Sequence, residues 1–353
     1  MRYGFLTLGP LSNPGYIRAR ELGKALLDRG VEVGYVVNDI PENRPAQIDP
    51  RAEIRFVAHP RSVRQFAERR RAIRDLGLDY LEVFPDQHGR TWITLAGFHG
   101  PRIVGFWDEP STVKDLGWLR HGFVVAMDRW LQKRADVRIV ATREHQRLWR
   151  EQHGMHALYM PHAAYLPTYP VGPSPFDRPT VVYMGNFYPW DQDLIFDALA
   201  LLARDGIRPP VLFMGTGPDL PKWQAFVRDH GLDQVTFAGY MTGEALFQRL
   251  RHAHVLLFPI RPTLVNKTRC PSKTLAYAQA RRPVITCHVG EIPEMLGDQA
   301  IYVEATPQGF AEAIRAVVVA PPAADIDYDI GRHSWANRAA DLLTEIGVNP
   351  RAS

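Results

Sequence analysis

Residues 255–277 read VLLFPIRPTLVNKTRCPSKTLAY, and this stretch is the most informative about the fold. The apolar run 255–258 predicts a strand buried on both faces, and a helix is expected to begin at Ser272, a good N-cap residue. The loop between them and the start of the helix contain four cations, Arg261, Lys267, Arg269 and Lys273. Cations, loop amides and the positive end of a helix dipole together can bind a diphosphate. A solvated basic loop is the alternative, because most charge runs are solvated.

Strands and helices alternate on both sides of this stretch. In the second half we expect strands at 181–184, 211–214, 235–237, 255–258, 284–286 and 300–303, and helices at 194–202, 221–229, 244–252, 308–318 and 334–346. In the first half we expect a helix around 19–26 and strands at 3–8, 31–37, 54–57, 80–84, 103–106 and 137–141. Such alternation predicts parallel sheets.

A proline-rich segment separates the two halves. Four prolines between 167 and 175 favour a stiff connector over helix or sheet. We therefore expect two Rossmann-like, doubly wound α/β domains with an interdomain cleft. The expected parts are an N-terminal domain at 1–168, a linker at 169–178, a C-terminal domain at 179–325 and a helical tail at 326–353 that crosses back to the N-terminal domain.

Composition narrows the class of protein. The chain has 353 residues, two cysteines and a net charge of +4. Two cysteines in so long a chain favour a reducing compartment, and the N-terminal apolar run is too short for a signal peptide. We therefore expect a cytoplasmic protein without a transmembrane segment. The positive charge favours phosphates, acidic membranes or nucleic acid as partners and does not choose among them.

Glycines follow several of the predicted strands, where a bare backbone lets a ligand approach closely. The candidates are Gly185 with Asn186, Gly215 and Gly217, Gly239 with Tyr240, and Gly15 in the first loop beside Ser12 and Asn13. The alternative is that these glycines are simply turns.

Several of these segments resemble the retaining glycosyltransferases of family 4, which have the GT-B fold. PSKTLAYAQARRPVI at 271–285 resembles the family's PSKLLEYMAAGKPVI stretch, and HVGEIPEMLGDQAIYV at 288–303 resembles the segment that follows it. FMGTGP at 213–218, VTFAGY at 235–240 and residues 21–37 resemble three further family segments. The resemblance runs from residue 5 to about 317. It implies a UDP- or GDP-linked sugar as donor, no metal or other cofactor, and an acceptor that the sequence does not identify.

The chain departs from the family at the usual donor-binding positions. Thr268 and Ala276 stand where the family has two glutamates, and Asn186 and residues 189–191 replace an arginine and a lysine. A family subgroup with a more basic loop matches better, at Asn266, Lys267, Arg269, Pro271 and Lys273. We therefore expect Lys267, Arg269 and Lys273 to bind the diphosphate of the donor in place of the usual side chains.

The resemblance implies a front-face displacement that retains the anomeric configuration and needs no protein nucleophile. Lys267 and Lys273 are the expected catalytic cations, because they would neutralise the leaving diphosphate. The donor-binding candidates are Gly15, Gly185, Asn186, Gly215, Gly217, Gly239, Tyr240, Arg261, Lys267, Arg269, Ser272, Lys273 and Thr274.

Asp108 is the acceptor-side candidate. It matches the second member of a family His-Asp pair, and Trp107 replaces the histidine. A base role and a plain N-cap or surface carboxylate are both open. His88, His99 and His162 follow other predicted strands, but lone histidines are usually structural.

Further interpretations remain open. Residues 61–74 predict a basic amphipathic helix that either lies on an anionic membrane or is an ordinary domain helix. The substituted family positions also allow a non-catalytic GT-B protein that binds a nucleotide sugar or a partner. Nucleic acid is not expected, because only charge speaks for it and no recognised motif is present.

Overall fold

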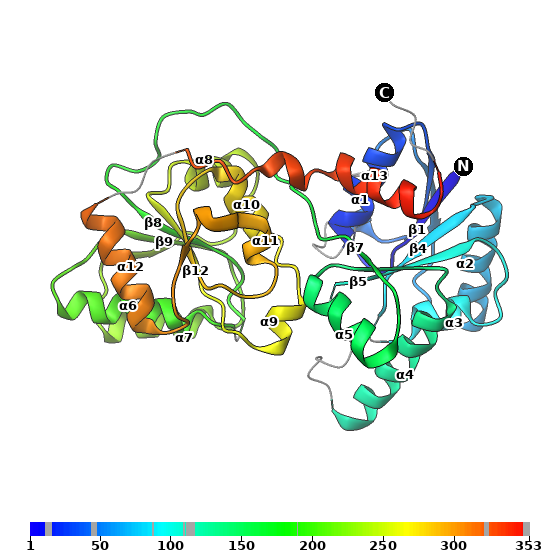
Figure 1. Ribbon diagram of the computed structural model, residues 1–353, viewed down its shortest axis with the longest axis horizontal. Helices are drawn as coiled ribbons and strands as arrows, with labels where there is room; N and C mark the ends of the chain where they lie inside the picture. Colours follow the sequence, from blue (N-terminus) through cyan, green and yellow to red (C-terminus); the bar gives the residue numbers. More distant parts are fainter. Residues whose placement is uncertain are drawn as a thin grey trace. The chain divides into compact units, whose positions relative to one another are not determined.

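The computed structural model describes residues 1–10, 16–43, 48–86, 88–108, 110, 117–188, 190–320 and 325–348. The chain forms two compact units. The first contains residues 1–163, 268–270 and the chain from 334 onward, and the second contains 164–267 and 271–333. Each unit has its own parallel sheet and its own hydrophobic core (Figure 1).

The described residues of the first unit form a sheet of seven parallel strands in the order β3-β2-β1-β4-β5-β6-β7. The strands are β1 (Arg2–Leu6), β2 (Glu32–Asn38), β3 (Glu53–Val57), β4 (Tyr80–Val83), β5 (Arg102–Trp107), β6 (Val137–Val140) and β7 (Leu158–Tyr159). Tyr3 of β1 lies opposite Val33 on one side and Tyr80 on the other. The strand order reverses between β1 and β4, as in doubly wound folds.

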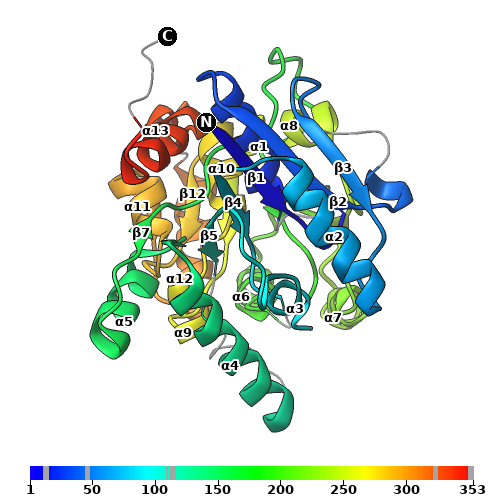
Figure 2. The same cartoon turned by 90° about the vertical axis from the view of Figure 1, so that its right-hand side faces the viewer.

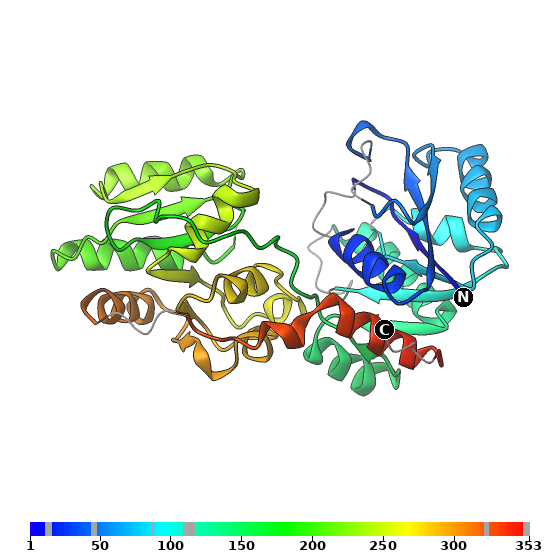
Figure 3. The ribbon, with the colours of Figure 1, turned by 90° about the horizontal axis from the view of Figure 1, so that it is seen from above.

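Helices cover both faces of this sheet. They are α1 (Ile17–Leu27), η2 (Pro41–Asn43), α2 (Val63–Asp75), α3 (Arg90–Leu95), α4 (Trp118–Arg134), α5 (Arg143–His153) and α13 (Trp335–Glu345). Helices α1 and α13 lie on one face, and α2, α3 and α4 lie on the other (Figure 2). Ser62, Thr142 and Ser334 cap α2, α5 and α13 with side-chain hydrogen bonds. Because α13 packs along α1, the C-terminal helix belongs to the first unit (Figure 3).

The second unit repeats the doubly wound plan with six parallel strands in the order β10-β9-β8-β11-β12-β13. The strands are β8 (Val181–Met184), β9 (Val211–Met214), β10 (Val235–Phe237), β11 (Val255–Phe258), β12 (Val284–Thr286) and β13 (Ile301–Tyr302). The helices are α6 (Asp193–Arg204), α7 (Leu220–Asp229), α8 (Gly243–Arg251), α9 (Leu264–Thr268), α10 (Lys273–Ala280), α11 (Ile292–Leu296), η4 (Gly297–Gln299), α12 (Pro307–Val319) and η5 (Ile330–His333).

Aromatic stacking fixes α6 on this second sheet. The Phe196 ring of α6 lies 4.6 Å from the Phe213 ring of β9 and 4.4 Å from the Trp223 ring of α7, measured between centroids. All three side chains are buried. Such stacked pairs contribute about 0.5–1.5 kcal/mol each beyond the area that they bury. Helix α12 runs beside α6 on the same face (Figure 1).

The predicted fold class of two Rossmann-like parallel-sheet domains is confirmed. Each predicted strand is present within two residues of its predicted bounds. The structure adds the short strand β7, and it corrects the basic loop after β11, which contains the helix α9. The proline-rich segment 169–178 forms neither helix nor strand.

Helix α2 carries the basic run predicted at 61–74. Its apolar residue Ile73 is fully buried in the core of the first unit, and Phe66 is half-buried. Two of its arginines also face inward: Arg69 is fully buried, and Arg70 donates to the carbonyl oxygens of Ile93, Thr94 and Ala96. Most of the apolar side of α2 therefore packs on its own domain, and its exposed side carries charges of both signs, such as Arg71 and Glu68.

Candidate functional site

The carboxyl ends of β8 and β11 lie side by side at the point where the strand order of the second sheet reverses. Val255 and Leu256 of β11 pair with Val181 and Val182 of β8. Open α/β sheets bind ligands at such a switch point. Gly185 follows β8 there, and the chain leaves β11 toward Arg261.

Lys273, at the first turn of α10, reaches this point. A Cβ atom added to Gly185 would lie 2.5 Å from Lys273 Nζ and 2.7 Å from the Tyr183 hydroxyl. The ammonium lies 4.8 Å from the ring centroids of both Tyr183 and Phe258, and 3.5 Å from the Tyr183 hydroxyl. Aromatic faces attract a cation and hold it in place. The structure thus brings the predicted residues Gly185 and Lys273 together.

The start of α10 is anchored by Tyr277. Its hydroxyl accepts a hydrogen bond from the Met184 amide at 2.8 Å and donates to the Leu257 carbonyl at 3.1 Å. Burial raises the pKa of Tyr277, so the phenol stays protonated and can donate. Since Met184 ends β8 and Leu257 lies in β11, this one side chain fixes α10 over the switch point.

Two predicted residues at the start of α10 have surroundings that the sequence did not indicate. Ser272 occupies the N-cap position, but its side chain makes no capping bond and is hydrogen-bonded to Tyr165 instead. The predicted N-cap position of Ser272 is therefore confirmed, although its side chain bonds to Tyr165 and not to a helix amide. Thr274 is fully buried, and its Oγ1 has no hydrogen-bond partner among the described residues.

The glycines after β9 have a clear structural reason. Gly215 has φ +143°, and a Cβ atom there would lie 1.9 Å from the Gly185 carbonyl oxygen. Gly217 has φ +155°, and its Cβ would lie 2.2 Å from the Phe187 carbonyl oxygen. The Gly185 amide donates to Met214 O at 2.9 Å, and the Phe187 amide to Thr216 O at 2.9 Å. These glycines let the loops after β8 and β9 pack backbone to backbone, and their role in donor binding remains a prediction.

Asn186, Gly239 and Tyr240 also follow strand ends. Asn186 is exposed, and its carbonyl oxygen accepts a hydrogen bond from Gln192 Nε2 at 2.9 Å. Gln192 Nε2 also donates to the Tyr183 hydroxyl at 3.3 Å. The other atom of this side-chain amide, Gln192 Oε1, has no partner among the described residues. Tyr240 follows Gly239 with 73% of its surface exposed. Sequence reasoning missed Gln192, which ties the loop after β8 to the Tyr183 hydroxyl beneath Lys273.

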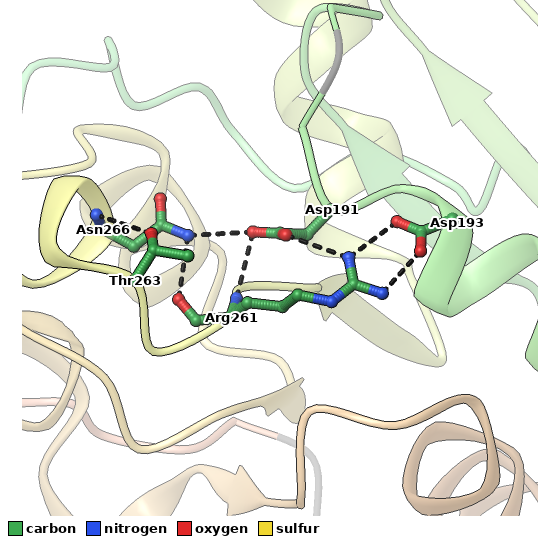
Figure 4. A network of polar contacts seen from close by, with 5 residues as sticks. All are labelled: Asp191, Asp193, Arg261, Thr263 and Asn266. Atoms are coloured by element: carbon green, nitrogen blue, oxygen red, sulfur yellow. Dashed lines mark hydrogen bonds and ion pairs between the residues drawn. The ribbon is translucent and has the colours of Figure 1, made fainter. Parts of the chain in front are cut away.

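Arg261 is held by two carboxylates (Figure 4). Its guanidinium donates to Asp191 Oδ1 at 3.1 Å, to Asp193 Oδ1 at 2.8 Å and to Asp193 Oδ2. Asp191 Oδ2 accepts from the Arg261 amide at 3.0 Å and from Asn266 Nδ2 at 2.9 Å. The hydrogen bonds with Arg261 lower the pKa of Asp193, and those with Asp193 raise the pKa of Arg261.

This network changes the expected use of Arg261. One guanidinium faces two carboxylates, so the three charged groups carry a net negative charge at neutral pH. In this arrangement Arg261 offers no surplus positive charge to a diphosphate. It fastens the chain after β11 to the start of α6, and the predicted donor contact would require these ion pairs to open.

Lys267 and Arg269 have different surroundings. Lys267 is exposed at the end of α9, and its Cα would lie 3.1 Å from a Cβ atom on Gly290 in the loop after β12. Arg269 is half-buried and belongs to the segment 268–270 of the first unit. Thr268, in the same segment, accepts a hydrogen bond at its carbonyl oxygen from Thr142 Oγ1 at 3.1 Å.

Asp108 lies in a polar cluster of the first unit. Its Oδ1 is 3.4 Å from His162 Nε2, and it also accepts a hydrogen bond from the Cys270 amide. Desolvation raises the pKa of Asp108, but the His162 contact and the Cys270 amide outweigh it and bring the pKa below its usual value. The side chain is 49% exposed, so the ionised carboxylate is open to solvent. Among the described residues, the next helix after Asp108 is α4, which begins after Gly117.

His145 adds a second imidazole near this carboxylate. It is fully buried in α5, and neither ring nitrogen has a hydrogen-bond partner among the described residues. Burial lowers the pKa of His145 to about 3, against a smaller opposing effect of Asp108. Trp107 points the other way, into the core, where its Nε1 donates to the buried Asp128. Sequence reasoning missed His145 and gave His162 no role, because only the order β5-β6-β7 brings their segments together.

One group of predicted residues lies outside the part of the chain that the structure describes. Gly15, Ser12 and Asn13 lie outside the described residues. Within the described ranges, no three His, Cys, Asp or Glu side chains gather as a metal site. In the same part of the chain, no helix combines the length and apolar character needed to cross a membrane.

One family model matches most of the second unit. Residues 178–319 match the family model described as "Glycosyl transferases group 1". This segment is therefore similar to the group 1 glycosyltransferases, over less than half of the chain. A comparison with curated proteins found no sequence match.

Solved structures share the fold of the whole chain. Sucrose-phosphate synthase from Thermosynechococcus elongatus is 16% identical, with a TM-score of 0.73 over 98% of each chain. HepE from Anabaena, solved with UDP and glucose, is 13% identical, with a TM-score of 0.70 over 98% of this chain and 99% of HepE. A glycosyltransferase from Rickettsia africae is 9% identical, with a TM-score of 0.68 over 97% of this chain and 93% of the other. At these identities the likeness shows the fold alone, and that fold is GT-B.

Proposed function

We propose that the protein is a glycosyltransferase that moves a sugar from a nucleoside diphosphate to an acceptor. The observation that carries the proposal is the Lys273 ammonium above Gly185, at the switch point of the unit that is similar to group 1 glycosyltransferases. The Lys273 ammonium can bind a diphosphate at this point of the sheet, because Gly185 has no side chain to keep the ligand away. HepE, which has the same fold, has been solved with UDP and with UDP-glucose.

In this proposal the start of α10 grips the diphosphate. Lys273, at the first turn of α10, supplies the positive charge that faces the diphosphate. Lys267 and Arg269 are the further cations that we expect to bind the donor, and no metal takes part. Preorganised donors stabilise the negative charge that develops on the leaving diphosphate. The sugar is transferred on its front face with retention of configuration, as in family 4.

Asp108 is the acceptor-side group of the proposal. Its carboxylate is ionised at neutral pH, so it can accept a hydrogen bond from an acceptor hydroxyl, whereas the lowered pKa makes it a weak base. We also propose a cytoplasmic location, because the chain has only two cysteines, Cys270 and Cys287, and both are buried.

A nucleotide-binding measurement tests the donor site. UDP or GDP should raise the melting temperature of the purified protein, because a ligand that binds only the folded state stabilises it. Lys273→Met should weaken binding of the same nucleotide by about 10- to 100-fold, the range expected for a lost charge-assisted hydrogen bond. Lys222→Met is the matched control, because Lys222 is exposed on α7 of the same unit. Equal nucleotide binding by the Lys273 variant and the control would remove Lys273 from the site.

A turnover assay separates an enzyme from a binding protein. The second candidate, a GT-B protein that binds a nucleotide sugar without transfer, is favoured by Thr268 and Ala276, which are buried where the family has glutamates. Release of nucleotide from a panel of UDP- and GDP-linked sugars, with and without EDTA, would establish catalysis and its independence from metal. NMR of the anomeric proton in the product would show retention or inversion. Tight binding without turnover of any donor would favour the binding protein.

A further inference from the structure

The first unit exposes large apolar side chains on α3 and α4. Trp118, Leu119 and Phe123 of α4 have 81%, 69% and 51% of their surfaces exposed. Trp92 and Ile93 of α3 each have 36% exposed. Single exposed apolar residues are ordinary, but a group of this kind on neighbouring helices marks an interaction surface.

These five side chains, called here the α3–α4 surface, belong to helices that pack together. The Trp92 ring lies 6.4 Å from the Trp130 ring of α4, measured between centroids. A Cβ atom added to Gly89, just before α3, would lie 3.4 Å from Phe123 Cζ. One end of α4 projects away from the sheet of its unit (Figure 2). Trp118 and Leu119 belong to the first turn of α4, where they have the greatest exposure.

The exposed charges of α4 itself are all positive. Residues 117–134 contain a single carboxylate, Asp128, which is 6% exposed and bonded to Trp107 inside the unit. The nearby carboxylate of Asp86, before α3, accepts hydrogen bonds from the amides of Arg90 and Thr91. Arg120, Arg129 and Lys133 are exposed along α4 itself. An anionic partner is therefore complementary to this part of the molecule.

We propose that the α3–α4 surface docks on an anionic lipid bilayer. Trp118, Leu119 and Phe123 would enter the interface, where indole and phenyl rings are stable between water and hydrocarbon. Arg120, Arg129 and Lys133 would meet the lipid phosphates, as the basic side chains of interfacial helices do. A projecting helix end fits a bilayer, which yields to it, better than it fits a rigid protein groove.

The proposal places the membrane contact on a different helix from the one that the sequence indicated. On α2 the apolar side packs into its own unit, and only Val63, 87% exposed, offers an apolar side chain to a bilayer. The α3–α4 surface instead presents aromatic side chains and cations together. The inference does not depend on the proposed function, since it concerns helices of the first unit only.

Vesicle sedimentation with the full chain tests the proposal. The protein should sediment with vesicles of phosphatidylcholine and phosphatidylglycerol at 7:3 and much less with phosphatidylcholine alone. The double variant Leu119→Ser/Phe123→Ser should bind the anionic vesicles at least about tenfold more weakly, because it removes two side chains from the apolar contact. Val63→Ser is the matched control and should bind like the wild type. Both variants change exposed residues, and circular dichroism melting checks that they are folded.

Three results would overturn the proposal. The wild type could fail to sediment with either vesicle. Val63→Ser could weaken binding as much as the α4 variant does, which would return the contact to α2. The wild type could be a dimer that the α4 variant converts to monomer, with vesicle binding unchanged, and the surface would then bind a second copy of the chain.

Discussion

Replacing Glu82 by Gln should strongly destabilise the first unit while leaving the second intact. Glu82 of β4 accepts hydrogen bonds from Arg18 Nε and from the Tyr3 hydroxyl, both at 2.7 Å. All three side chains are fully buried. Arg18 also lies 4.1 Å from the Phe106 ring centroid, and its Nη2 is 3.0 Å from Met160 Sδ. Apart from Glu82, no carboxylate among the described residues pairs with this guanidinium.

The magnitude follows from the burial of the pair. Glu82→Gln removes the one carboxylate that pairs with Arg18 among the described residues, and a Gln amide offers one acceptor where the carboxylate offered two. Removing one partner of a fully buried ion pair costs about 3–5 kcal/mol, since the other charge stays buried without compensation. The variant Arg18→Met/Glu82→Leu removes both charges at similar volume and should recover most of the loss.

Hydrogen exchange measured by mass spectrometry resolves the two units. Global unfolding need not be two-state in a two-unit chain, so peptides from β1 and β4 report on the first unit and peptides from β8 and β11 on the second. Protection in β1 and β4 should fall roughly 10²- to 10³-fold or more in Glu82→Gln, with no change in β8 and β11. A loss below about 1 kcal/mol, or a double variant no more stable than Glu82→Gln, would refute the reasoning.

Two further predictions concern the site and the pH dependence. Gly185→Ala should weaken nucleotide binding in the thermal-shift assay without unfolding the protein, because the new Cβ atom would displace Lys273 Nζ, 2.5 Å away; Gly331→Ala, which meets no atom within 4 Å, is the control. Unchanged binding by Gly185→Ala would show that the position of Lys273 does not matter. The buried His145 has a pKa of about 3, below its ordinary value, so its contribution to stability is full above about pH 6.5 and is lost as the pH falls. The wild type should therefore lose more first-unit stability than His145→Leu between pH 7 and pH 5, by about 2 kcal/mol. Hydrogen exchange, corrected for the intrinsic exchange rate, measures this difference. An equal loss in both proteins would contradict the lowered pKa of His145.

The helices and strands were largely predictable because their signals are local. Continuous apolar runs such as 181–184 and 211–214 become strands buried on both faces of a parallel sheet. Helix α9 was missed, since its five residues lie within a run rich in cations and proline and show no apolar periodicity. The strand β7 was missed because two residues, Leu158 and Tyr159, are too few to form a pattern.

The candidate site was predictable in part. The spacing from β11 to α10 placed Lys273 at the start of a helix, and the structure puts its ammonium above Gly185. The sequence could not reveal that Arg261 is neutralised, because Asp191 and Asp193 lie about 70 positions away along the chain. For the same reason it could not pair Asp108 with His162 and Cys270.

The sequence by itself therefore determined the two parallel-sheet domains and the cationic character of the candidate site, because apolar runs, turn residues and the basic strand-loop-helix are properties of neighbouring residues. The tertiary structure decided which cations remain available for a ligand. Arg261 is bound by two carboxylates, Lys273 is held on aromatic rings over Gly185, and the apolar side of α2 packs into its own unit while α4 exposes Trp118. These outcomes depend on contacts between residues far apart in the chain, and the free energy of such contacts leaves no local pattern in the sequence.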